Sequence, residues 1–151
     1  MIIIADSISK SGIPCEISHD LMGYLWGKML FNCALNPLGA ILKVNYGTLI
    51  ENPFTISIMN NVIDEIFEVI KAEDYKIPWN TSKEYKDLFY SKLAPDGHNH
   101  YSSMFQDIEN KNKTEIDALN GKVVKLAKKH NIDVPVNKML YNMIKAIENN
   151  F

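Results

Sequence analysis

Three polar side chains interrupt an otherwise apolar or small-residue stretch between Leu21 and Leu42, and their spacing suits the binding of a small anion. Lys28, Asn32 and Asn36 recur at every fourth position. At about 100° per residue, this spacing places all three in one narrow wedge of a helix, over about 12 Å of its length. One ammonium group and two carboxamides in a row are well suited to bind a small polar anion such as a keto acid. This row is the strongest functional indication in the sequence.

The helix that must carry this row is predicted to be buried on nearly all sides, because its other positions are mainly large and apolar. Lys28 would then need a partner, since an unpaired charge away from water is costly. Pro37 and Gly39 are expected to end or kink the helix. Ser18 or Asp20 is expected to cap its start.

Composition limits the class of protein. The chain has 151 residues, of which 46% are hydrophobic and 23% charged, as in a globular domain with one core. Its net charge is −2 and it contains no basic block, so we expect no nucleic-acid partner. Lys28 and Pro37 argue against a membrane span at the long apolar stretch. Cys15 and Cys33 show no metal-ligand spacing, which favours a reducing cytoplasm.

The hydrophobic periodicity predicts an all-α fold, a single domain of about six helices without a convincing strand pair. After the first helix, the expected helices span 53–73, 81–93, 102–110, 114–130 and 137–149. Residues 45–47 are expected to form a turn and 94–100 a loop. Thr114 and Asp117 resemble a capping box at the start of their helix. Residues 1–11 are interpreted as the tail of an interdomain linker.

Several segments together resemble one known family. They are WGKMLFNCALNPLGA at 26–40, SSMFQDI at 102–108, KTEIDALNG at 113–121 and NIDVPVN at 131–137. In order, spacing and residue type they resemble the C-terminal domain of ketopantoate reductase, a helical domain of the kind found in 6-phosphogluconate dehydrogenase-like proteins. The resemblance extends from about residue 12 to the end of the chain, so 12–151 are expected to form the substrate-binding and catalytic domain.

The resemblance implies NADPH-dependent reduction of ketopantoate (2-dehydropantoate) to pantoate, a step of pantothenate biosynthesis. It assigns the general acid to Lys28 and substrate binding to Asn32, Asn36, Ser103 and Glu115. Hydride delivery to a ketone builds negative charge on its oxygen, so a charged donor aimed there stabilises the transition state and supplies the proton. The residue types of the row therefore fit the implied chemistry.

The sequence departs from the family in one large respect. The family carries an N-terminal Rossmann domain with a G-x-G-x-x-G loop, and no three of the seven glycines here have that spacing. The resemblance therefore implies that NADP is bound mainly by a Rossmann domain missing from this chain. We expect this chain to be a C-terminal half that lacks turnover alone, with ketopantoate and the missing domain as partners and with a homodimer as a further expectation.

Structural roles compete with the functional ones. Lys28 could lie at a helix edge with its ammonium in water, and the two asparagines could hydrogen-bond between helices. Glu115 could stabilise the first turn of a helix, and Ser103 could be an N-cap.

Other functions also stay open: reduction of another 2-keto acid, or a non-catalytic helical module for dimerisation or the binding of small acids. His98 and His100 have H-x-H spacing without an evident third ligand, so no metal site is expected.

Overall fold

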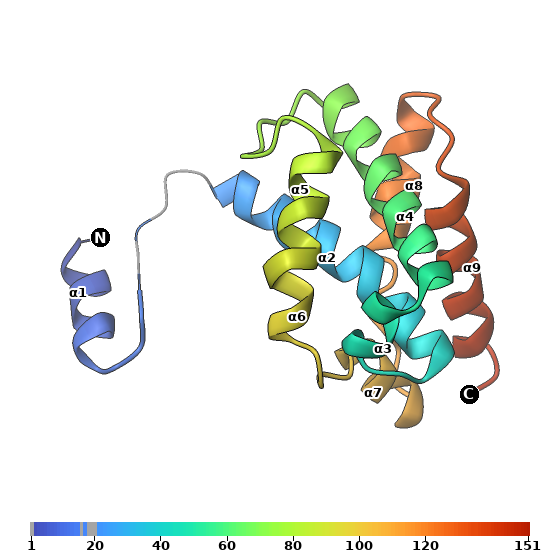
Figure 1. Cartoon of the computed structure of the whole chain (residues 1–151), viewed down its shortest axis with the longest axis horizontal. Helices are drawn as coiled ribbons and strands as arrows, with labels where there is room; N and C mark the ends of the chain where they lie inside the picture. The colour runs from blue at the N-terminus through green and yellow to red at the C-terminus, as the bar shows by residue number, and fades with distance from the viewer. Residues whose placement is uncertain (1, 16, 18–20) are drawn as a thin grey trace.

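The computed structural model describes residues 2–15, 17 and 21–151, and the expected all-α fold is confirmed (Figure 1). The described part of the chain contains nine α-helices, one π-helical turn and no strand. The elements are α1 (Ile2–Lys10), α2 (Leu21–Leu42), α3 (Tyr46–Glu51), α4 (Pro53–Ala72), α5 (Ser82–Leu88), the π-helical turn η1 (Phe89–Leu93), α6 (Ala94–Asp96), α7 (Ser103–Glu109), α8 (Asn120–Lys129) and α9 (Pro135–Glu148).

Helix α2 runs through the middle of the bundle and packs against α3, α4, α7 and α9 (Figure 1). Every residue from 33 to 40 is buried, as predicted. The first half of the helix differs, because the side chains of Leu21, Met22, Tyr24 and Leu25 are exposed. Burial on nearly all sides was therefore wrong for this half. The proposed caps Ser18 and Asp20 lie outside the described residues.

Pro37 lies inside α2 and does not end it. A proline has no N–H, so the carbonyl of Cys33 four residues earlier loses its helical partner. The side chain of Asn120 replaces that partner, because its Nδ2 donates to the Cys33 carbonyl at 3.2 Å. The helix therefore continues to Leu42 with the orphaned carbonyl satisfied from α8.

A buried chain of amides extends this bond across the bundle. Asn120 Nδ2 also donates to Asn137 Oδ1 at 2.9 Å. Asn137 Nδ2 donates in turn to Glu65 Oε2 at 2.7 Å. The Glu65 carboxylate also accepts the backbone N–H groups of Val136 and Asn137 in the first turn of α9. This amide network, made of Asn120, Asn137 and Glu65, joins α2, α8, α9 and α4.

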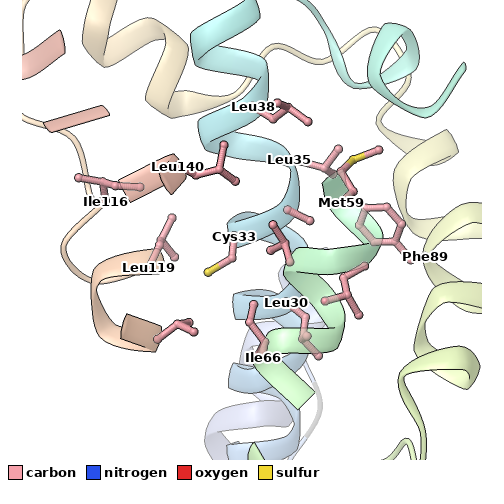
Figure 2. Close-up of a cluster of buried hydrophobic side chains, with 14 of the residues drawn as sticks. Leu30, Cys33, Leu35, Leu38, Met59, Ile66, Phe89, Ile116, Leu119 and Leu140 are labelled. Carbon is pink, nitrogen blue, oxygen red and sulfur yellow. The ribbon is translucent and has the colours of Figure 1, made fainter. Parts of the chain in front are cut away.

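The hydrophobic core forms where α2, α4 and α9 meet (Figure 2). Leu30 and Leu35 of α2 and Met59 and Ile66 of α4 are fully buried. Helix α4 matches the predicted helix at 53–73, with Pro53 in its first turn and Asn52 as its N-cap. This packing fixes the orientation of α2 and of the polar row that it carries.

Several local predictions were wrong at turns. Asn45 begins α3 as an N-cap, since its Oδ1 accepts from Thr48 N at 2.9 Å, so 45–47 are not a free turn. The helix expected to end at 93 continues through η1 and α6 to Asp96. Residues 2–10 form α1, so the segment interpreted as the tail of an interdomain linker is helical.

The capping-box prediction at Thr114 was also wrong. Helix α8 begins at Asn120. The Thr114 hydroxyl accepts from the N–H of Ile116, two residues on, and itself donates to Glu148 Oε1 of α9. Residues 114–119 therefore form a turn-containing segment anchored to α9, and Glu115 does not lie in the first turn of a helix.

The amide network predicts a specific coupling between Asn120 and Pro37. Asn120→Ala leaves the Cys33 carbonyl buried and unpaired, which costs about 2–3 kcal/mol of the free energy of unfolding. Pro37→Ala returns an N–H to that carbonyl, so the same Asn120→Ala change costs at least about 1 kcal/mol less in this background. Urea unfolding of the four proteins measures the difference.

Asn142→Ala, an exposed asparagine change on α9, is the matched control and should cost little. An Asn120→Ala cost that is the same in both backgrounds would contradict the explanation of why Pro37 is tolerated.

Candidate substrate-binding site

Helix α2 carries the predicted row from the surface into the interior. The helix is unbroken from Leu21 to Leu42, so Lys28, Asn32 and Asn36 lie on one face. Lys28 is exposed, Asn32 is half-buried and Asn36 is only 3% exposed. The row therefore presents its ammonium group at the surface and its last carboxamide inside the bundle.

The side chain of Asn36 is oriented by Tyr46, a residue that the sequence did not single out. The Tyr46 hydroxyl donates to Asn36 Oδ1 at 2.8 Å. No described residue accepts a hydrogen bond from Asn36 Nδ2, so this group keeps its two donors for another molecule. Tyr46 itself is buried, and its ring forms T-shaped contacts with the rings of Phe31 and His100. The carboxamide is thus held through its oxygen, while its N–H groups have no acceptor among the described residues.

The two serines of the S-S-M segment, Ser102 and Ser103, differ in burial and in role. Ser102 is buried and is the N-cap of α7, because its hydroxyl accepts from Phe105 N at 3.1 Å. The same hydroxyl donates to the backbone carbonyl of Asn36 at 3.3 Å, which ties α7 to α2. Ser103 is the first residue of α7 and is exposed, so the N-cap alternative for Ser103 was wrong. Ser103 is left with an accessible hydroxyl beside the anchored Ser102.

Glu115 acts electrostatically on the buried end of the row. Burial raises the pKa of the Cys33 thiol well above its ordinary range, and the negative charge of Glu115 raises it further. Burial and then the same charge raise the pKa of Tyr46 to about 12. The Glu115 carboxylate is therefore near enough to α2 for its charge to act there, and the Tyr46 hydroxyl stays protonated at neutral pH.

Lys28 and Glu115 are both exposed and do not pair with each other. Neither side chain forms a hydrogen bond or an ion pair with any described residue. The expectation that burial would give Lys28 a partner was wrong, because its half of α2 is open to solvent.

No metal centre emerges from residues 2–15, 17 and 21–151, where no three histidine, cysteine, aspartate or glutamate side chains are grouped as a metal site. Instead, the Nε2–H group of His98 donates to Glu51 Oε1 at 2.9 Å, and His100 packs on Tyr46. The H-x-H loop thus has a structural role beside Tyr46.

No helix in the described part of the chain is long and apolar enough to cross a membrane.

Comparison with known proteins gives one consistent relationship. The family model for the C-terminal region of the ketopantoate reductases PanE/ApbA matches residues 20–148. A 2-dehydropantoate 2-reductase of Aquifex aeolicus is 47% identical over 145 residues, which are 96% of this chain and 46% of that protein. One from Pyrococcus horikoshii is 32% identical over a similar region. The chain spans about half the length of the curated relatives it matches.

Solved structures agree with the sequence relatives. A PanE/ApbA family ketopantoate reductase from Ralstonia eutropha superimposes with a TM-score of 0.86 at 31% identity, over 99% of this chain and 48% of that one. A D-mandelate dehydrogenase bound to NADH and anilino(oxo)acetate also has a TM-score of 0.86, at 27% identity, over 98% of this chain and 48% of that one.

From the raised pKa of the buried Tyr46 hydroxyl, caused first by burial and then by the charge of Glu115, we predict a pH-dependent contribution to stability. Tyr46→Phe removes the buried donor and costs about 1–2 kcal/mol of the free energy of unfolding near pH 7. The folded-state pKa of about 12 lies above the ordinary value of 10.0, so the hydroxyl's contribution is full below pH 10 and is lost as the pH rises toward 12. Urea unfolding of both proteins between pH 7 and 11 should show their difference shrinking above pH 10.

Tyr101→Phe is the control, because Tyr101 is 42% exposed and its hydroxyl has no partner among the described residues. A Tyr46→Phe cost no larger than that of Tyr101→Phe would show that the Asn36 bond adds nothing to the fold.

Proposed function

This chain belongs to the ketopantoate reductase family, and on that premise we propose that it is the keto-acid-binding and proton-donating half of an NADPH-dependent 2-dehydropantoate 2-reductase. The observation that carries the proposal is the arrangement on α2. The ammonium group of Lys28, which has no partner among the described residues, lies in one row with the carboxamide of Asn36. No described residue accepts from Asn36 Nδ2, and Tyr46 holds the Asn36 Oδ1.

Lys28 is proposed as the general acid. Reduction of the ketone leaves negative charge on its oxygen, and a positively charged N–H donor at that oxygen lowers the barrier. The Lys28 Nζ then passes a proton to the alkoxide, which gives the hydroxy acid and a neutral amine. Because the side chain is exposed, the amine recovers its proton from water.

The carboxamides and the polar groups around them are proposed to orient the substrate. Asn32 and Asn36 offer N–H donors to the oxygens of the keto acid, which suits an anion without an arginine in the sequence. Ser103 offers an exposed hydroxyl near the same end of α2, and Glu115 offers an acceptor for a substrate hydroxyl. These groups hold the ketone in line with the Lys28 donor.

A reduced nicotinamide nucleotide, when bound, supplies the hydride that reaches the carbonyl carbon. The glycines of this sequence do not have the G-x-G-x-x-G spacing of a dinucleotide loop, so we assign no residue of this chain to the nucleotide. Nucleotide binding is proposed for a Rossmann domain, with NADPH as the cofactor, and the 151-residue chain by itself is expected to show negligible turnover. A cytoplasmic location fits the two free thiols, Cys15 and Cys33, and a homodimer remains a prediction.

The proposed role of Lys28 is tested in a chimeric enzyme. Residues 12–151 replace the matching half of the Aquifex aeolicus reductase, and NADPH oxidation with ketopantoate is followed at 340 nm. Lys28→Ala should lower kcat by about 10²- to 10⁴-fold, because general acid catalysis contributes about that much. Circular dichroism should show an unchanged helical content, since Lys28 is exposed.

Lys125→Ala is the matched control. Lys125 is also exposed and free of an ion pair among the described residues, but it lies on α8. A Lys28→Ala enzyme with the kcat of the Lys125→Ala enzyme would contradict the assignment of the general acid.

A further inference from the structure

A largely covered carboxylate on α9 has no part in the proposed chemistry, and it holds the residue next to Glu115. The side chain of Glu148 is only 5% exposed. Its Oε1 accepts from the backbone N–H and from the hydroxyl of Thr114, each at 2.8 Å. Its Oε2 accepts from Lys145 Nζ at 2.6 Å. Glu148 therefore anchors Thr114, which directly precedes Glu115 in the chain.

The pair of Lys145 and Glu148 is ionised. Burial by itself would raise the pKa of the Glu148 carboxyl, but the hydrogen bonds from Lys145 and Thr114 outweigh burial and lower this pKa. Hydrogen bonds to Glu148 and then to Asp117 raise the pKa of the Lys145 ammonium group. Both groups are therefore charged at neutral pH, and removal of Lys145 leaves the covered Glu148 carboxylate without its cation.

Lys145 also holds the residue on the other side of Glu115. Its Nζ lies 3.1 Å from Asp117 Oδ2. The Tyr141 hydroxyl donates to Asp117 Oδ1 at 2.8 Å. One ammonium group is thus shared between two carboxylates that flank the segment carrying Glu115. We call this set of contacts the α9 clamp, which joins Tyr141, Lys145 and Glu148 of α9 to Thr114 and Asp117.

The α9 clamp fixes the backbone around Glu115 while leaving its side chain in solvent. Ile116 follows Glu115 and is fully buried in the hydrophobic core (Figure 2). Glu115 itself is exposed. Its charge nevertheless acts on Tyr46, the residue that holds Asn36. The clamp therefore keeps an accessible acceptor near the buried end of the polar row.

We propose that Lys145 and Glu148 are positioning residues, which hold Glu115 where it accepts a hydrogen bond from the hydroxyl group of the keto-acid substrate. This inference rests on the proposed function, in which Glu115 binds that hydroxyl. Without Lys145, the negative charges of Glu148 and Asp117 are no longer bridged and repel each other. The segment 114–119 then moves away from α9 and displaces Glu115.

Two keto acids that differ by one hydroxyl group test the proposal. Ketopantoate carries the hydroxyl, and 3,3-dimethyl-2-oxobutanoate has the same carbon skeleton without it. Their Kd values for the 151-residue chain are measured from ¹⁵N–¹H spectra, at the side-chain signals of Asn32 and Asn36. Lys145→Met should weaken ketopantoate binding about tenfold, since a hydrogen bond to a charged group is lost. Binding of the hydroxyl-free acid should change by less than about twofold, because it offers Glu115 no donor.

A double-mutant cycle shows whether Lys145 acts through Glu115. Glu115→Gln should also weaken ketopantoate binding about tenfold, and Lys145→Met should add less than about twofold in that background. Lys138→Met is the matched control, because Lys138 is exposed on α9 and has no ion pair among the described residues. This control should leave both Kd values unchanged.

A second variant keeps the test decisive if Lys145→Met does not fold. Asp117→Asn loosens the α9 clamp at its exposed end, where the Asp117 side chain is 63% exposed. It should cause a smaller loss of affinity that is again confined to the acid with the hydroxyl.

The outcomes separate the α9 clamp from the proposed function. If a clamp variant weakens the binding of both acids alike, or weakens ketopantoate binding further in the Glu115→Gln background, the positioning role is overturned and the function stands. If Glu115→Gln leaves ketopantoate binding unchanged, the proposal is overturned because Glu115 does not bind the hydroxyl. If neither acid shifts the Asn32 and Asn36 signals, the proposed function fails together with the inference.

Discussion

The bond from Asn120 to the Cys33 carbonyl allows α2 to remain one helix, and the position of the site depends on that continuity. Pro37 removes the N–H that this carbonyl needs, in a stretch where every residue is buried and water cannot replace it. Asn137 and Glu65 hold Asn120 in place from α9 and α4. A single missing backbone donor is thus compensated by side chains from three other helices.

Because α2 is unbroken, the polar row runs from the surface into the interior of the bundle. Its surface half leaves Lys28 in water, charged and unpaired among the described residues, while its buried half fixes Asn36 between Tyr46 and Ser102. An exposed charge at one end and a fixed carboxamide at the other suit a ligand that needs both proton transfer and orientation. The negative charge of Glu115 adds an acceptor near the fixed end.

Periodicity sufficed for the long amphipathic helices, because α4 and α9 each bury one continuous stripe. Periodicity failed to predict helix boundaries where a side chain distant in sequence donates or accepts a hydrogen bond. A proline in the interior ends or kinks most helices. Only the position of Asn120 shows why Pro37 does not end α2. Tyr46 was missed because its neighbours Asn45 and Gly47 are typical of turns, although Asn45 in fact caps a helix. The motif at 26–40 indicated the row itself, since residue type and spacing suffice when the helix is regular.

A crystal structure of this chain with ketopantoate is the most direct test of the central claim that the row on α2 binds the keto acid. The account predicts the ketone oxygen within hydrogen-bond distance of Lys28 Nζ, and acid oxygens at the Nδ2 groups of Asn32 and Asn36, with the Tyr46–Asn36 bond retained. Ketopantoate bound away from α2, with the Lys28 ammonium still directed into water, would contradict it.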